Sequence, residues 1–243
     1  MQITAKTWNE YITRLSRLNR KAEHLMRQYI DTHGTGDADA LIAYAAALVT
    51  KYGEGSAELA CQMYDALAEA AKAGVPAAEP AEPADYGEVA RMVNVTKNPA
   101  NLPSGVSRLV KRAGADTTLK NAVRDGAEWA WVPHGDTCPF CITLASKGWQ
   151  KASNKVLKGG HANHIHANCD CEFAIRFDRS TTLAGYDPEK YLKQYRDAGG
   201  DINKMRRVQY AANKERINAQ KRAAYAERKL SANEEKPAAS GIF

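Results

Sequence analysis

The stretch that decides the fold reads CPFC at residues 138–141 and, after a spacer, HANHIHANCDC at residues 161–171. Four of the five cysteines in the chain fall inside it, namely Cys138, Cys141, Cys169 and Cys171. Zinc is held tetrahedrally by thiolate sulfur and imidazole nitrogen, and a Cys-x-x-Cys turn presents two sulfurs to one ion. We therefore expect this stretch to bind one Zn²⁺.

The second pair of ligands is less sharply defined by spacing. His166 and Cys169 lie three positions apart, as Cys138 and Cys141 do, and Cys171 competes with His166 for the same role. The candidate metal ligands are therefore Cys138, Cys141, His166, Cys169 and Cys171. Which of His166 and Cys171 completes the coordination shell stays open.

A structural ion is favoured over a catalytic one. A hydrolytic zinc keeps one coordination position for water and has a general base nearby, whereas the cluster offers only Glu172, on an expected strand. The HExxH, zinc-deaminase and Walker patterns are missing from the sequence. We expect the protein not to be an enzyme.

The competing class is a zinc-dependent or HNH-like nuclease that acts on DNA. His161 and His164 would then bind a second ion and activate water, but no later helix carries the Asn and His that such a site needs. A third alternative is a zinc-containing adaptor that binds nucleic acid.

Short strands flank the cysteines. Residues 127–136 read AEWAWVPHGD and residues 169–178 read CDCEFAIRFD, with the alternation of a half-buried strand, while ITLASKGW at 142–149 favours a short helix. The sequence thus predicts a small zinc-clamped β-hairpin knuckle, which we place in a domain spanning residues 86–180.

Residues 1–74 are expected to form an N-terminal helical bundle. Apolar residues recur every three or four positions from Trp8 to Tyr29, which predicts one long amphipathic helix. Two Ala-rich helices follow, and Gly53 and Gly55 predict a break between them. Residues 75–85, VPAAEPAEPAD, contain three prolines and are expected to be an extended linker.

The C-terminal part carries the excess of positive charge. Asp187-Pro188 opens one helix within residues 181–230, and a second begins at Asp201. The second helix has a thin apolar stripe, expected to pack along one side: Met205, Val208, Ala212, Ile217 and Tyr225. Its cations are Lys204, Arg206, Arg207, Lys214, Arg216, Lys221, Arg222, Arg228 and Lys229. Residues 231–243 are expected to be a flexible tail, and the fold class is mainly α (α+β).

Composition limits the partners. The chain has 243 residues, a formal charge of +6 and a pI near 9.0, which suits a partner that carries phosphates. No apolar run approaches the roughly 18 residues that span a bilayer, so no membrane partner is expected. In a reducing cytoplasm, clustered cysteines favour a metal over disulfides.

PHGDTCPFCITLASKGW at 133–149, followed by HANCDC at 166–171, resembles the zinc-knuckle segment of bacteriophage minor head proteins related to the Mu F head-morphogenesis protein. The matching residues are Cys138, Cys141, His166, Asn168, Cys169 and Cys171. The resemblance extends over roughly residues 86–228 and is firm around the knuckle.

The resemblance implies a structural minor capsid protein of a tailed phage. Expected partners are the portal protein, the major capsid or scaffolding protein, and DNA through the basic C-terminal helix. The expected location is the virion, in the capsid interior or at the portal vertex, after assembly in the cytoplasm of the bacterial host.

Overall fold

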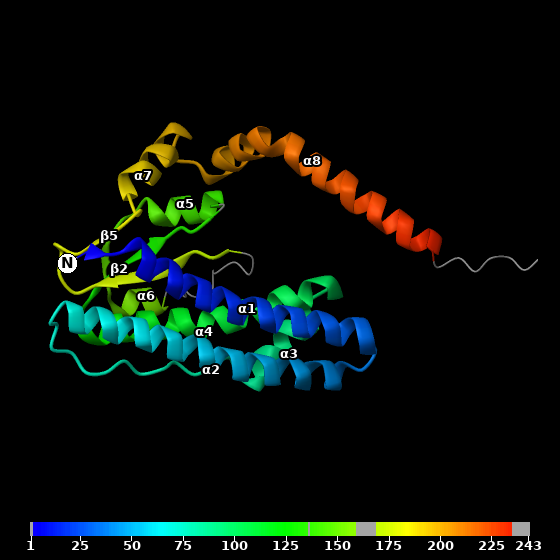
Figure 1. Cartoon of the computed structure of the whole chain (residues 1–243), viewed down its shortest axis with the longest axis horizontal. Coiled ribbons are helices and arrows are strands. Elements are labelled where there is room, and N and C mark those ends of the chain that lie inside the picture. The colour runs from blue at the N-terminus through cyan, green and yellow to red at the C-terminus, as the bar shows by residue number, and fades with distance from the viewer. Residues whose placement is uncertain (1, 136, 159–168, 235–243) are drawn as a thin grey trace, which may run out of the picture.

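A computed structural model describes residues 2–135, 137–158 and 169–234 of the chain (Figure 1). The elements, in chain order, are β1 (Gln2–Ile3), α1 (Ala5–His33), α2 (Ala38–Ala70), α3 (Tyr86–Val95), the 3-10 helix η1 (Pro99–Asn101), α4 (Leu102–Asp125), β2 (Glu128–Val132), α5 (Pro139–Ala145), β3 (Gln150–Lys151), α6 (Asn154–Lys158), β4 (Glu172–Arg176), β5 (Thr182–Leu183), α7 (Pro188–Asp197) and α8 (Ile202–Glu234). The expected mainly α (α+β) class is confirmed.

Helices α1, α2 and α4 pack side by side and form the body of the molecule (Figure 1). The expected amphipathic pattern of α1 is confirmed, because Trp8, Tyr11, Leu15 and Ala22 are buried. Asp37 caps α2 by accepting a hydrogen bond from the backbone N–H of Ala40 at 3.0 Å. Burial of these apolar faces is the main source of stability in such a bundle.

The expected break at Gly53 and Gly55 is wrong, because α2 continues through both residues. A Cβ at Gly53 would lie 3.0 Å from Cβ of Pro83, and one at Gly55 would lie 3.3 Å from Cδ1 of Leu18. The two glycines therefore let other segments approach α2 closely, and tertiary packing outweighs their low helix propensity.

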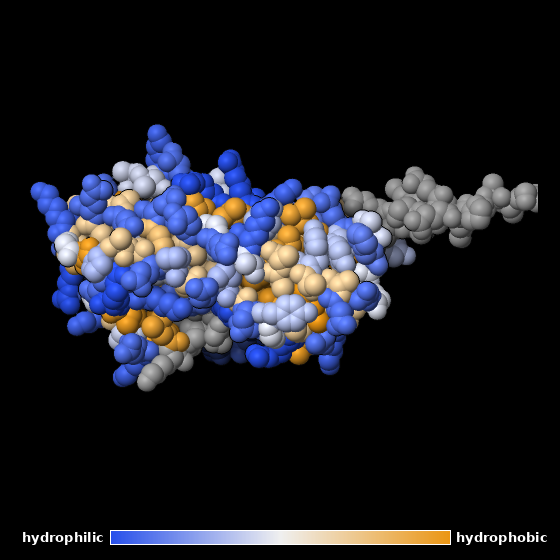
Figure 2. All heavy atoms as spheres, turned by 90° about the horizontal axis from the view of Figure 1, so that it is seen from below, coloured by the Kyte–Doolittle hydropathy of each residue, from blue (hydrophilic) through white to orange (hydrophobic). Residues whose placement is uncertain are grey.

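Residues 75–85 are extended, as their prolines predict, and they are tied to the helices along which they run. The backbone N–H groups of Ala78 and Ala81 donate to Asp65 Oδ1 and Thr117 Oγ1, at 2.7 and 2.9 Å. Figure 2 shows the face where this segment and α2 lie, with small hydrophobic areas among hydrophilic side chains. Helix α4 packs on α1 and α2 across the expected boundary, and the division into separate folding units stays a prediction.

A three-stranded sheet of order β3-β2-β4 caps one end of the bundle. Strands β2 and β4 are antiparallel, and Trp131 lies opposite Phe173 and Val132 opposite Glu172. Between these two strands the chain forms α5, β3 and α6, so the expected β platform with a short helix is present, although β2 and β4 are not joined by a tight turn. This pairing brings Cys171, one residue before β4, beside the end of β2.

Helix α8 leaves the body of the molecule and projects from it (Figure 1). Its beginning contacts α5, and Gln209 Nε2 donates to the carbonyl of Thr137 at 2.8 Å. Of the expected apolar stripe only Met205 is buried, whereas Val208 is 65% and Tyr225 70% exposed. The expected packing of the whole stripe is therefore wrong, because the outer part of this helix projects away from the other described elements (Figure 1).

The helix also continues to Glu234, four residues into the expected tail, and residues 235–243 lie outside the described part of the chain. Among the helices of the described residues, none is both long and apolar enough to cross a lipid bilayer.

Candidate metal centre

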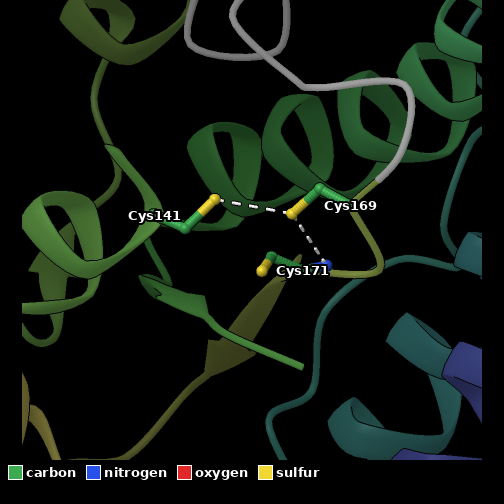
Figure 3. A group of neighbouring side chains, drawn as sticks. All are labelled: Cys141, Cys169 and Cys171. Carbon is green, nitrogen blue, oxygen red and sulfur yellow. Dashed lines mark hydrogen bonds between the residues drawn. The ribbon is translucent and has the colours of Figure 1, made fainter. Parts of the chain in front are cut away.

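Three buried cysteines meet between α5 and the start of β4 (Figure 3). The sulfurs of Cys141, Cys169 and Cys171 all lie within 4.8 Å of one another, and the sulfurs of Cys141 and Cys169 are 3.4 Å apart. None of the five cysteines is joined to another by a disulfide bond. Three sulfurs at this separation lie close enough to hold one metal ion.

Local structure explains how Cys138 and Cys141 are presented. Cys138 is the N-cap residue of α5, Pro139 occupies the first turn, and the N–H of Cys141 points at Cys138 Sγ at a distance of 3.5 Å. A helix start with proline in its first turn is a stable local arrangement. Cys138 is half-buried and adjoins the three-sulfur group without belonging to it.

Backbone amides also point at the other sulfurs. The N–H of His134, just beyond β2, donates to Cys171 Sγ at 3.4 Å, and the N–H of Cys171 donates to Cys169 Sγ at 3.4 Å. Hydrogen bonds from neutral donors favour a charged sulfur over a neutral one. Each of these N–H groups favours the thiolate, which is the form that binds metal, at Cys138, Cys169 and Cys171. The pKa of Cys171 is nevertheless raised to about 12, because its hydrogen bond with Cys141 lowers it less than its hydrogen bond with Cys169 and its burial raise it.

The pKa values of the clustered cysteines are shifted in opposite directions. Hydrogen bonds from the thiols of Cys141 and Cys171 lower the pKa of Cys169 to about 2. The pKa of Cys141 is raised, first by its hydrogen bond with Cys138 and then by that with Cys169. A thiolate among buried thiols is a centre of negative charge that a bound cation would stabilise.

Lys111 of α4 lies beneath the cluster and is buried. Its Nζ donates to the carbonyl oxygens of Cys169 and Cys171, the latter at 2.8 Å, and lies 3.4 Å from Glu172 Oε1. Burial raises the pKa of Glu172, and the charge of Lys111 opposes that rise. Glu172 is thus engaged in a buried ion pair.

Helix α1 holds the residue between the two cysteines. Asp170 accepts hydrogen bonds from Ser16 Oγ at 2.7 Å and from the Arg20 guanidinium at 3.0 Å. The Cys169–Asp170–Cys171 turn is therefore held from two sides. Lys111 of α4 binds the backbone carbonyls of the turn, and Ser16 and Arg20 of α1 bind the carboxylate of Asp170.

Of the four cysteines expected from their spacing, the structure brings Cys141, Cys169 and Cys171 together. The neighbouring residues Lys111, Asp170 and Ser16 were not predicted from the sequence. The available signal for Lys111 was its place in α4, where residues at helical spacing on either side, Ser107 and Ala115, are small and buried. A lysine flanked in this way needs a partner for its charge. The candidate ligand His166, together with His161 and His164, lies outside the described residues, so the choice between His166 and Cys171 stays a prediction.

Fold and site define a mainly helical protein with a buried cluster of cysteines that could hold a metal ion. A family profile described as VG15 protein matches residues 2–198, a range that includes the bundle, the sheet and the cysteine cluster. The chain belongs to the VG15 protein family, a family of viral proteins that includes phage proteins. Neither a curated protein nor a solved structure matches the chain.

Proposed function

We propose that this protein is a structural minor capsid protein of a tailed phage that associates with the portal and the procapsid during head assembly. The observation that carries the proposal is the meeting of Cys141, Cys169 and Cys171, because these residues belong to the motif by which the chain resembles minor head proteins. Membership of a viral protein family agrees with this role and with a place in the virion.

Assembly in a bacterial host tests the proposal. We would co-express the chain with the major capsid, scaffolding and portal proteins of the same phage, purify the procapsids and measure their protein content by mass spectrometry. The chain should be found in procapsids that contain portal and be lost from those made without it. Free chain in the supernatant of portal-containing procapsids would contradict the role.

The proposed cofactor is one structural Zn²⁺ held by Cys138, Cys141, Cys169 and either Cys171 or His166. The support is the donor set, since buried and half-buried cysteine sulfurs with backbone N–H groups aimed at them suit a closed tetrahedral zinc site. Bound zinc would contribute on the order of 10 kcal/mol to the stability of the folded knuckle.

We propose no enzymatic activity. The carboxylates beside the cysteines already have partners, because Glu172 pairs with Lys111 and Asp170 pairs with Ser16 and Arg20. A general base for water activation would have to be free to accept a proton. Cleavage of duplex DNA by the purified chain with Mg²⁺ or Zn²⁺, lost on replacing His161 or His164, would instead support the nuclease alternative.

DNA is a proposed partner of α8. Met205 is buried and Gln209 and Asn213 are half-buried, so these residues mark the face of α8 that is directed toward the body. At 3.6 residues per turn, an exposed row at seven-residue spacing, Arg207, Lys214 and Lys221, lies nearly opposite that face. A projecting helix with a row of cations on its outer side suits the phosphate backbone.

A further inference from the structure

Lys111 makes more contacts than a buried ion pair requires. An ammonium group has three donors, and Lys111 directs two of them at the carbonyls of Cys169 and Cys171 while its charge lies 3.4 Å from Glu172 Oε1. The side chains of both Lys111 and Glu172 are almost fully buried, with 2% and 4% of their surface exposed. The contacts of Lys111 therefore join α4 to Cys169 and Cys171, the two cysteines that lie outside α5.

We propose that Lys111 is a positioning residue of the metal centre, and this proposal rests on the zinc site proposed above. By holding the carbonyls on both sides of Asp170, Lys111 fixes the turn so that the sulfurs of Cys169 and Cys171 face the same ion as Cys141. Groups that orient metal ligands in this way typically affect metal affinity by 10- to 100-fold.

The charge of Lys111 has a second effect. Zn²⁺ with three thiolates and one imidazole carries a net charge of about −1, and with four thiolates about −2. A buried cation bonded to the backbone of two ligands offsets this charge in a low-dielectric site. The carboxylate of Glu172 balances the charge of Lys111 when the cysteines are protonated. The charge of Lys111 should therefore favour metal binding, and the charge of Glu172 should oppose it.

A different result is expected if the Lys111–Glu172 ion pair serves only to stabilise the fold. If the pair only stabilised the fold, removing either partner would leave one uncompensated buried charge and would damage the protein similarly. If Lys111 serves the metal centre, removing its charge weakens zinc binding, whereas removing the charge of Glu172 leaves zinc binding unchanged or tightens it.

The test is zinc affinity, measured on the purified, reduced full chain by competition with a chromophoric chelator. The variants are Lys111→Met, Glu172→Gln and, as a matched control, Val110→Ala, which removes buried volume from the neighbouring position of α4. We expect Lys111→Met to weaken zinc binding at least 10-fold. Glu172→Gln should bind zinc at least as tightly as the wild type, and Val110→Ala should lower the melting temperature without changing zinc affinity.

An affinity of Lys111→Met within about threefold of the wild type would overturn the proposal, since groups that orient ligands have larger effects. Equal weakening in Lys111→Met and Glu172→Gln would overturn it too. If Lys111→Met does not fold, the double variant Lys111→Met/Glu172→Gln contains no lone buried charge and is compared with Glu172→Gln alone. Failure of the wild type to bind zinc would contradict the proposed zinc site itself, and so the two failures are distinguishable.

Discussion

In the proposed zinc site, Cys171 and His166 are the two alternatives for the fourth ligand, and substituting each of them distinguishes the alternatives. Cys171 Sγ already lies within 4.8 Å of the other two sulfurs and accepts the N–H of His134. We expect Cys171→Ser to lose bound zinc, because a serine hydroxyl is a poor zinc ligand, and His166→Ala to keep one zinc per chain. Elemental analysis of the reduced proteins checks this.

Cys61→Ser is the control for cysteine loss, because Cys61 lies in α2 and outside the three-sulfur group. It should keep its zinc. Zinc retained in Cys171→Ser and lost in His166→Ala would instead place the imidazole in the shell and leave Cys171 as a buried neighbour.

Gly114 tests how closely α2 and α4 approach. A Cβ at this position would lie 2.6 Å from Ser56 Oγ and 3.1 Å from its carbonyl oxygen, so the two helix backbones would have to separate. We expect Gly114→Ala to lower the free energy of unfolding by about 1–3 kcal/mol, although alanine is the better helix former. Urea denaturation measures it. Gly36→Ala, with open space around the new methyl group, should be neutral or slightly stabilising.

Single residues were predictable from sequence where their chemistry is local. Cys138 and Cys141 could be proposed as one pair of ligands because three positions of chain limit their separation, and of the two the structure places Cys141 in the three-sulfur group. Lys111 could not be assigned, since its partners Cys169 and Glu172 lie about sixty positions away and only the packing of α4 against β4 brings them together. The role of Gly53 was hidden for the same reason, because Pro83 reaches it through the fold.

At the scale of elements, α3 is joined to α4 by an ion pair whose strength depends on pH. The Arg112 guanidinium donates to both carboxylate oxygens of Glu88, and this hydrogen bonding lowers the pKa of Glu88 below its usual 4.5. A carboxylate with a lowered folded-state pKa stabilises the protein above its unfolded pKa, and that stabilisation is lost as pH falls through the folded value.

We therefore expect Glu88→Gln to cost about 1 kcal/mol at pH 7, the size of a partly exposed ion pair. The difference from the wild type should shrink as the pH falls below about 4, because wild-type Glu88 is then protonated as well. Chemical denaturation at pH 7, 5 and 3.5 measures it. The exposed Glu82→Gln is the control, and a difference for Glu88→Gln that grows toward acid pH would contradict the assigned pair.

Whole elements were predictable where periodicity is strong, and the rest depended on packing. The long pattern of α1 and the strands β2 and β4 followed from the spacing of apolar residues. The two-residue strands β1 and β5 carry too few positions for a pattern, yet they pair in parallel and join the start of the chain to residues just before α7. The prolines of residues 75–85 correctly excluded a helix, whereas the side chains that tie this segment down lie in α2 and α4.

At the scale of the whole molecule, the two ends of the chain differ in character. The body has two hydrophobic clusters, one at the sheet and one at the α3 side of the bundle, and both contain residues of α1, α2 and α4. Among residues 202–226 of helix α8, whose side chains the structure describes, Met205 is the one buried apolar residue. The part of α8 that lies away from the body therefore depends for its helical form on local propensity or on a binding partner. A partner should accordingly be sought first on this helix.

The last prediction concerns that partner. If DNA binds the outer face of α8, replacing Arg207, Lys214 and Lys221 by Gln removes three phosphate contacts. Each contact contributes about 0.9 to the slope of log affinity against log salt, so the slope should become shallower by about 3. Fluorescence anisotropy with a labelled duplex between 50 and 200 mM salt measures both affinity and slope.

The control removes the same charge from α1, by replacing the exposed Arg14, Arg17 and Lys21 with Gln. Both variants lose three positive charges, so a general effect of net charge would weaken DNA binding equally in the α1 and α8 variants. A DNA contact confined to α8 would change the salt slope in the α8 variant alone. An unchanged slope in the α8 variant with a shallower slope in the α1 variant would move the DNA contact to the bundle and leave α8 for a protein partner.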